Sequence, residues 1–291
     1  MTDPTGRLCV VGAGSMGAQI AQQAALHGIE VALQDTAPEQ LSRAVDSNRA
    51  RLERRVERGR IPGDVAEAAL ARVRTTTSLE EAAEGASLAV EAIVEQLEPK
   101  RLVFAELGRL LPEAAILASN SSTMTPSQLA GASGRPDRVL GLHFFYPPLV
   151  MELVEVVRGP QTSDRTVERA TAFVEAIGRT PVVLQKEIGG FIVNRILHMA
   201  SQEAYRLLDQ DVASFEDIDT AVEKGLRWPL GPFRLGDLSG LDVTYAARRH
   251  MFEQTGDERY RPSEKLRAKV EKGQLGRKTG QGWYTYEQRP R

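Results

Sequence analysis

The sequence predicts an α/β fold in which a doubly wound, mostly parallel sheet is followed by an all-helical C-terminal domain. Three observations predict it. Short apolar runs alternate with helical patterns as far as about Pro181. A glycine-rich turn joins the first apolar run to the first helix. Beyond Pro181, strand signals become rare and long helical stretches take their place.

The apolar runs predict strands at residues 7–11, 29–34, 87–93, 115–118, 139–145 and 151–157. Runs of this kind are typical of strands buried on both faces of a parallel sheet. Helical patterns predict a first helix that stops at Gly28, and further helices over residues 38–60, 65–73, 99–111, 191–208 and 214–224. A segment containing Pro62 and Gly63 breaks the chain between the helices at 38–60 and 65–73.

The change of pattern places a domain boundary between residues 185 and 190. We therefore expect an N-terminal α/β domain at residues 1–187 and a helical domain at residues 188–291. A chain of 291 residues suits two domains of ordinary size.

Composition excludes several classes of function. A net charge of -2 argues against a general binder of nucleic acid. No apolar run approaches the ~18 residues of a membrane span. The polar stretch Met1–Arg7 is too short for a secretory signal, so we expect a cytoplasmic protein. The single cysteine, Cys9, lies in an apolar run and predicts a buried, reduced thiol. We expect no metal site.

The glycine-rich turn has the spacing of a dinucleotide-binding motif, in which residues 12–17 read Gly-Ala-Gly-Ser-Met-Gly. The first glycine allows the tight turn, the second lets the backbone approach a pyrophosphate, and the third lets the helix pack on the strand. The expected cofactor contacts are Gly12, Gly14, Ser15, Met16 and Gly17. The pyrophosphate would face the free N–H groups at the start of the helix.

Asp35 follows the second expected strand, where an acid bonds the ribose hydroxyls of a dinucleotide. Its charge would repel a 2′-phosphate, so NAD is favoured over NADP. The pattern is that of a Rossmann-type domain that binds NAD. The alternative is a glycine turn in a doubly wound protein that binds no dinucleotide.

Seven further segments follow this motif in a distinctive order. They are Glu91–Glu95 (EAIVE), Ala118–Ser122 (ASNSS), Gly141–Phe145 (GLHFF), Leu153–Val157 (LVEVV), Gly190–Arg195 (GFIVNR), Pro229–Phe233 (PLGPF) and Gly276–Gly282 (GRKTGQG). With the glycine turn they resemble the L-3-hydroxyacyl-CoA dehydrogenase family, including its 3-hydroxybutyryl-CoA enzymes. The resemblance extends from Leu8 to about Tyr286.

The resemblance implies an NAD-dependent oxidoreductase of fatty acid and lipid metabolism. Such an enzyme reversibly oxidises an L-3-hydroxyacyl-CoA to the 3-ketoacyl-CoA. The resemblance also implies that the C-terminal helical domain contributes to substrate binding and forms the contact of a homodimer.

His143 is the expected general base. Oxidation of a secondary alcohol requires loss of a proton from oxygen, and the pKa of histidine lies near neutrality. Of the four histidines, only His143 lies at the end of an expected buried strand, where such sheets bind ligands. Glu155 interrupts an apolar run, where a carboxylate is costly unless it is paired. In the family the matching residues form the catalytic pair; the alternative is a buried ion pair without chemistry.

Ser122 and Asn194 match family positions that bond the reacting oxygen of the substrate, and are the other expected catalytic residues. Asn194 belongs to the helical domain, so we expect a site in the cleft between the domains. The alternative for Ser122 is a helix cap before Pro126. The alternative for Asn194 is a polar residue at a helix N-terminus.

The resemblance extends to further cofactor and substrate contacts. Those expected near the ribose and nicotinamide of NAD are Glu95, Lys100, Asn120, Ser122 and His143, although Glu95 and Lys100 could be surface charges. Those expected for the acyl-CoA are Arg51, Arg58, Ser122 and Tyr146. Arg51 and Arg58 are two of seven arginines in residues 43–60. A solvated helix face, balanced by Asp46, Glu53 and Glu57, is the alternative.

The sequence departs from the family at two positions; the change at Tyr146 keeps other substrates open, and the glycine at 189 predicts easier domain closure. Tyr146 stands where the family has an asparagine, and Gly189 stands where it has a proline. One rival is a dehydrogenase of the same fold that acts on a group bound to an acyl carrier protein, or on a free hydroxy or sugar acid. Another rival is a structural protein that binds NAD without catalysis.

Overall fold

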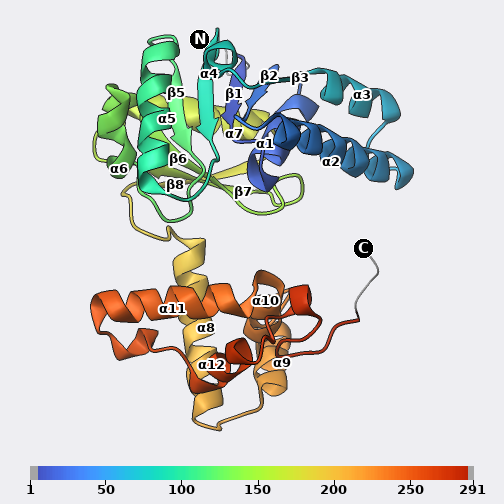
Figure 1. Cartoon of the computed structure of the whole chain (residues 1–291), viewed down its shortest axis with the longest axis vertical. Helices are drawn as coiled ribbons and strands as arrows, with labels where there is room; N and C mark the ends of the chain where they lie inside the picture. Colours follow the sequence, from blue (N-terminus) through green and yellow to red (C-terminus); the bar gives the residue numbers. More distant parts are fainter. Residues whose placement is uncertain (1–5, 288–291) are drawn as a thin grey trace. The chain divides into compact units, whose positions relative to one another are not determined.

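The computed structural model describes residues 6–287 and divides into two compact units, 1–192 and 193–291 (Figure 1). Residues 1–5, part of the N-terminal stretch used in the argument about location, lie outside the described residues. In the described residues, no helix is long and apolar enough to cross a membrane.

The first unit is built on one eight-stranded sheet with the strand order β3-β2-β1-β4-β5-β6-β7-β8. The strands are β1 (Leu8–Val11), β2 (Val31–Gln34), β3 (Val73–Thr76), β4 (Leu88–Glu91), β5 (Ile116–Ser119), β6 (Val139–Phe144), β7 (Leu153–Arg158) and β8 (Thr180–Leu184). The first six are parallel, β7 is antiparallel to β6, and β8 is parallel to β7. The predicted doubly wound, mostly parallel sheet is confirmed.

Two edge strands differ from the sequence prediction. The helix expected over residues 65–73 ends at Ala71, and β3 begins at Val73. No strand was expected at β8. Both strands lie at edges of the sheet and are only partly buried, so neither shows the continuous apolar run of a central strand.

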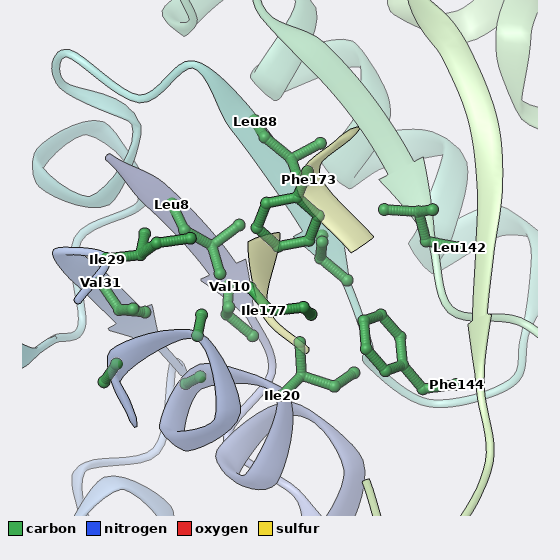
Figure 2. Close-up of a cluster of buried hydrophobic side chains, with 14 of the residues drawn as sticks. Leu8, Val10, Ile20, Ile29, Val31, Leu88, Leu142, Phe144, Phe173 and Ile177 are labelled. Atoms are coloured by element: carbon green, nitrogen blue, oxygen red, sulfur yellow. The ribbon is translucent and has the colours of Figure 1, made fainter. Parts of the chain in front are cut away.

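Helices cover both faces of this sheet. They are α1 (Ser15–Leu26), α2 (Pro38–Glu57), α3 (Gly63–Ala71), α4 (Leu79–Ala83), α5 (Leu97–Leu110), α6 (Ser127–Ala130) and α7 (Asp164–Ala176). Alternate residues of each strand point to opposite faces. Val10 of β1 packs in the cluster that contains Ile20 of α1 and Phe173 of α7 (Figure 2), whereas its neighbour Cys9 packs with Phe104 of α5 on the other face.

Helix α2 is shorter than predicted and ends at Glu57 rather than Arg60. Gly59 takes a left-handed conformation, with φ 63°, and the Arg60 N–H bonds back to the Arg55 carbonyl at 2.8 Å. This is the glycine stop that commonly ends helices. Arg58 is therefore the residue that caps the helix, not one in its interior.

The second unit is helical, as predicted. Its helices are α8 (Val193–Asp209), α9 (Phe215–Gly225), α10 (Pro232–Ser239), α11 (Leu241–Thr255) and α12 (Glu264–Glu271). Tyr205, Phe233 and Trp283 meet ring to ring in its core. The buried carboxylate of Asp237 accepts the backbone N–H groups of Trp283 and Tyr284, each at 2.9 Å, and so holds the C-terminal segment against α10.

Candidate active site

The glycine-rich turn follows β1 and leads directly into α1. Gly12 has φ 101°, and a Cβ there would come within 2.6 Å of the Ala92 carbonyl oxygen. A Cβ on Gly17 would collide with the carbonyl oxygen of Gly12. By contrast, a Cβ on Gly14 would meet nothing within 4 Å. Gly12 and Gly17 therefore have no room for a side chain within the folded protein, while Gly14 leaves open space in front of the helix N-terminus.

Asp35 follows β2 and lies against this turn. One carboxylate oxygen accepts the Ala13 N–H at 2.8 Å, and the other accepts the Ala37 N–H at 3.0 Å. Ser15 and Met16 lie in the first turn of α1, where Ser15 is exposed and Met16 packs against the core. An open glycine turn at a helix N-terminus, with an acid beside it, fits the pyrophosphate and ribose of NAD.

A buried charged cluster lies at the end of β4. Glu91 is wholly buried, and its carboxylate accepts hydrogen bonds from Lys100 Nζ at 2.6 Å, Ser119 Oγ at 2.7 Å and the Ile93 N–H at 2.8 Å. The Lys100 side chain is 1% exposed and also pairs with Glu95, at 3.2 Å. Lys100 is therefore enclosed by protein, whereas the Glu95 side chain is 42% exposed.

Glu95 is held as a carboxylate at the surface of this cluster. Partial burial opposes its ionisation, but hydrogen bonds from Ser121 and Thr123 and the charge of Lys100 together lower its pKa. Ser121 also accepts the Met124 N–H at 2.9 Å and so organises the turn after β5. The helix cap considered for Ser122 is not seen, because α6 is capped at Pro126 without a side-chain bond, and Ser121 makes the side-chain bonds of this turn. Within the described residues, the Ser122 hydroxyl makes no hydrogen bond.

Asn120 joins the ends of two neighbouring strands. It follows β5, and its side-chain oxygen accepts the Phe144 N–H of β6 at 3.0 Å. This bond ties the turn that contains Ser122 to the strand that contains His143. Asn120 therefore fixes the position of the turn that contains Ser122 relative to His143.

His143 and Glu155 form a buried pair across two strands. They are directly opposite in the antiparallel register of β6 and β7, and His143 Nδ1 lies 2.7 Å from Glu155 Oε2. His143 is 5% exposed and Glu155 is 0% exposed. A carboxylate can only accept a hydrogen bond. Nδ1 of His143 therefore carries the ring proton, and its N–H donates a hydrogen bond to Glu155. The other ring nitrogen, Nε2, has no hydrogen-bond partner among the residues that the structure describes.

Two phenylalanines and one backbone amide hold this pair. The ring of His143 contacts those of Phe145 and Phe191, with centroids 4.5 and 5.4 Å away. The Ile192 N–H donates to the second oxygen of Glu155, at 3.0 Å. Phe191 has φ 50°, an unfavourable conformation for a bulky residue, and it persists because the ring is buried and the next amide is bonded.

The remaining expected residues lie outside the two strands of this pair. Asn194 is in the first turn of α8, in the helical unit, and its place relative to His143 stays a prediction. Tyr146, three residues after His143, is 61% exposed. Arg51 is partly buried and bonds Ser47, whereas Arg58 is exposed at the end of α2.

Sequence reasoning assigned no role to Glu91, Ser119 or Phe191. Glu91 ends an apolar run, which is the same signal that identified Glu155. Ser119 and Phe191 carry no such signal, because each becomes informative only once its contacts are known.

Comparison with known proteins agrees with this geometry. Residues 7–188 match the NAD-binding domain of 3-hydroxyacyl-CoA dehydrogenase, and residues 190–286 match its C-terminal domain. The chain is 41% identical over 277 residues to a probable 3-hydroxybutyryl-CoA dehydrogenase of Deinococcus radiodurans, covering 95% of this chain and 99% of the relative.

Solved structures show the same fold over the whole chain. An (S)-3-hydroxybutyryl-CoA dehydrogenase from Ralstonia eutropha superposes with a TM-score of 0.90 at 35% identity, over 97% of this chain and 99% of the other. A diketoreductase acting on dicarbonyl compounds superposes with a TM-score of 0.85 at 33% identity, over 96% and 98%. The resemblance drawn from the motifs is confirmed, and the chain belongs to the 3-hydroxyacyl-CoA dehydrogenase family of NAD-dependent oxidoreductases.

Proposed function

We propose that this protein oxidises a short-chain L-3-hydroxyacyl-CoA, such as 3-hydroxybutyryl-CoA, to the 3-ketoacyl-CoA, and runs the reaction in both directions. The observation that carries the proposal is the His143–Glu155 pair, in which one ring nitrogen is bonded and the other has no partner in the described residues. That is the arrangement of a general base that is held in place and free to act.

The proton step follows from the hydrogen bonding of the pair. Because Glu155 fixes the proton on Nδ1, the neutral ring keeps its lone pair on Nε2. Nε2 takes the proton of the substrate hydroxyl as the carbonyl forms, and Glu155 stabilises the resulting imidazolium. When bound, NAD supplies the acceptor for the hydride that leaves the same carbon. Reduction reverses both transfers.

Neutral polar groups would hold the reacting oxygen. The Ser122 hydroxyl makes no bond within the described residues, so it is available to donate to the substrate oxygen. Asn194 is the second proposed donor, and Tyr146 is proposed to border the thioester end of the substrate. Asn120 bonds the backbone of β6, and we propose that it contacts cofactor and substrate through its remaining amide group.

The cofactor is proposed to contact Glu95 directly and Lys100 indirectly. Glu95 is exposed and ionised, and it can accept from hydroxyl groups near the nicotinamide. Lys100 is enclosed, so its proposed role is to position Glu95. Gly12, Gly14, Ser15, Met16, Gly17 and Asp35 complete the proposed NAD contacts.

The decisive test measures NADH oxidation with acetoacetyl-CoA and with free acetoacetate, for wild type, His143→Ala and His27→Ala. We expect turnover on the CoA ester and a loss of kcat of about 10²–10⁴-fold in His143→Ala, measured at NADH concentrations that saturate the variant. His27 bonds a carbonyl of its own helix at 2.9 Å, so its variant is the matched control and should keep its kcat.

Other outcomes point to other functions. Equal turnover in His143→Ala would refute the proposed base. Turnover on free acetoacetate but not on the ester would favour the second candidate, a dehydrogenase of the same fold that acts on a free hydroxy acid; the structurally similar diketoreductase acts on dicarbonyl compounds. NADH binding without turnover on either would favour a carrier-protein thioester as substrate, or a structural role.

A homodimer formed through the helical unit is also part of the proposal. The helices α8 and α11 expose the large apolar residues Ile196, Met199 and Val243, and a second copy of the chain would cover them. Light scattering should show a dimer that Ile196→Glu converts to a monomer.

We also propose a cytoplasmic location, since Cys9 is buried and unpaired.

A further inference from the structure

The segment that joins β8 to α8, residues 185–192, is held to the first unit near both of its ends. Near its start, the Glu187 carboxylate accepts the Ser127 N–H at 2.9 Å. At its end, the Ile192 N–H donates to Glu155 Oε1 at 3.0 Å. The second bond reaches the buried acid of the catalytic pair from the residue directly before α8. It is therefore the contact through which this segment can act on the reaction.

Two successive residues in the left-handed conformation precede Ile192. Gly190 has φ 76°, and Phe191 has φ 50°. They complete a turn in which the Phe191 N–H donates to the Ile188 carbonyl at 3.1 Å. Glycine adopts a positive φ readily, whereas a residue with a Cβ is disfavoured there by a factor of roughly 5 to 30. Phe191 therefore conflicts with its own backbone conformation, and Gly190 does not.

Packing of the Phe191 ring offsets this conflict. The side chain is 1% exposed and forms an apolar cluster with Val157 of β7 and Leu184 of β8. Its ring also contacts the ring of His143, with the centroids 5.4 Å apart. Val157 and Glu155 are two residues apart on β7, so their side chains point to the same face of the sheet. The strained residue is thus anchored beside the acid that accepts the next N–H.

The conformation of Phe191 sets the direction of the Ile192 N–H, because the peptide group between the two residues is planar and turns with the Phe191 backbone. In the right-handed or extended conformation of residue 191, this N–H would point elsewhere. The bond occupies one oxygen of Glu155, while the other lies 2.7 Å from His143 Nδ1. A carboxylate held at both oxygens cannot rotate, so the His143 ring keeps one direction for Nε2.

We propose that Phe191 is a positioning residue for the reaction, and that its left-handed backbone aims the Ile192 N–H at Glu155 and so fixes the direction of the His143 base. The inference rests on the proposed function and adds to it a role for the segment that joins the two units. A residue that only fills the core acts through its bulk. Phe191 acts through its backbone conformation as well, and this difference can be measured.

The test compares alanine with glycine at position 191, because both remove the ring but only alanine resists the left-handed conformation. NADH oxidation with acetoacetyl-CoA gives kcat and KM. We expect Phe191→Ala to lower kcat by roughly 10- to 100-fold, which is typical for loss of a hydrogen bond to a charged group. Phe191→Gly should keep a kcat at least about 5-fold above that of Phe191→Ala. KM should stay unchanged in both, since the buried side chain contacts no substrate.

A role in packing alone predicts the opposite order, because glycine removes more volume than alanine and loses more freedom on folding. Asp211 is the matched control, since it has φ 53°, is exposed and lies beyond the other end of α8. Asp211→Gly should be more stable than Asp211→Ala in urea, and both should keep the wild-type kcat. A kcat of Phe191→Gly no higher than that of Phe191→Ala, or an equal difference in kcat between the Asp211 variants, would overturn the proposal.

Amide hydrogen exchange separates failure of this inference from failure of the proposed function. Ile192 is 41% exposed, so protection of its N–H would come from the bond to Glu155 rather than from burial. By NMR of isoleucine-labelled protein, this N–H should exchange slowly in wild type and Phe191→Gly, and roughly 10-fold or more faster in Phe191→Ala.

If this exchange pattern is found but no thioester is turned over, the positioning of Glu155 by Phe191 stands and the proposed reaction falls. If the ester is turned over but the two Phe191 variants exchange the Ile192 N–H equally fast, the proposed reaction stands and the positioning falls. Exchange of this N–H in wild type as fast as that of an unbonded amide would overturn the inference without any variant.

Discussion

Two buried carboxylates in strands of the same sheet are paired with bases, yet their surroundings differ. Glu91 bonds a lysine whose amino group also reaches Glu95, and its own two oxygens accept three donors. Glu155 bonds a histidine through one ring nitrogen and a backbone amide through its second oxygen. Both carboxylates are 0% exposed.

The two pairs differ in whether an atom of the pair remains without a hydrogen-bond partner. The Lys100 cluster is enclosed, and its amino group is shared between two carboxylates. The His143 pair keeps one ring nitrogen without a partner in the described residues. Burial of a charged pair is thus a poor guide to catalysis by itself, since structural pairs are buried too. An atom of the pair that remains able to accept a proton is the better guide.

The largest expected effect separates the two carboxylates by catalysis. In Glu155→Gln, one amide oxygen must serve two donors, the His143 ring and the Ile192 N–H. If the oxygen stays with Ile192, the amide nitrogen faces Nδ1, and the ring proton moves to Nε2, which can no longer act as a base. We expect kcat to fall about 10³-fold, measured by NADH oxidation.

Glu91→Gln is the matched control, because it makes the same chemical change in the enclosed cluster. Its kcat on the folded protein should remain within a few fold of wild type. Comparable losses of kcat in the two variants would show that both pairs serve catalysis, and the distinction between them would fail.

The second effect separates the pairs by stability. Lys100→Met leaves Glu91 buried without its cation, and breaking a buried pair from one side costs about 3–5 kcal/mol. Urea denaturation should show this loss in the free energy of unfolding. Adding Glu91→Gln to Lys100→Met removes the stranded charge and should restore part of it. A single variant as stable as wild type would mean that the Lys100 pair does not hold the fold.

The central sheet could be predicted from the sequence because its strands are buried on both faces. The runs at β1, β4 and β5 are continuous and apolar, and each was found. The edge strands β3 and β8 were missed, since one face of each meets solvent and their residues look like loop or helix. Edge strands take their identity from the neighbour they pair with, which is a tertiary property.

A site residue could be predicted from the sequence where a charged side chain interrupts an apolar run. A carboxylate in an apolar run predicts a paired acid, and this singled out Glu155. The same argument applies to Glu91, but its partners, Lys100 and Ser119, come from two other elements.

The smallest expected effect distinguishes two adjacent serines, one with a structural role and one with a catalytic role, as in the two carboxylate pairs. Ser121 is buried and bonds Glu95 and the backbone of the turn, whereas Ser122 has no hydrogen bond in the described residues. Ser121→Ala should therefore lower the free energy of unfolding by about 1–2 kcal/mol and leave kcat nearly unchanged. Ser122→Ala should leave stability unchanged and lower kcat roughly 10- to 100-fold, because the reacting oxygen loses a donor.

Each serine is the other's control, since the substitution and the turn are the same. Urea denaturation and NADH oxidation on both variants check the division, and a kcat loss in Ser121→Ala as large as in Ser122→Ala would show that the turn, not the free hydroxyl, supports the reaction.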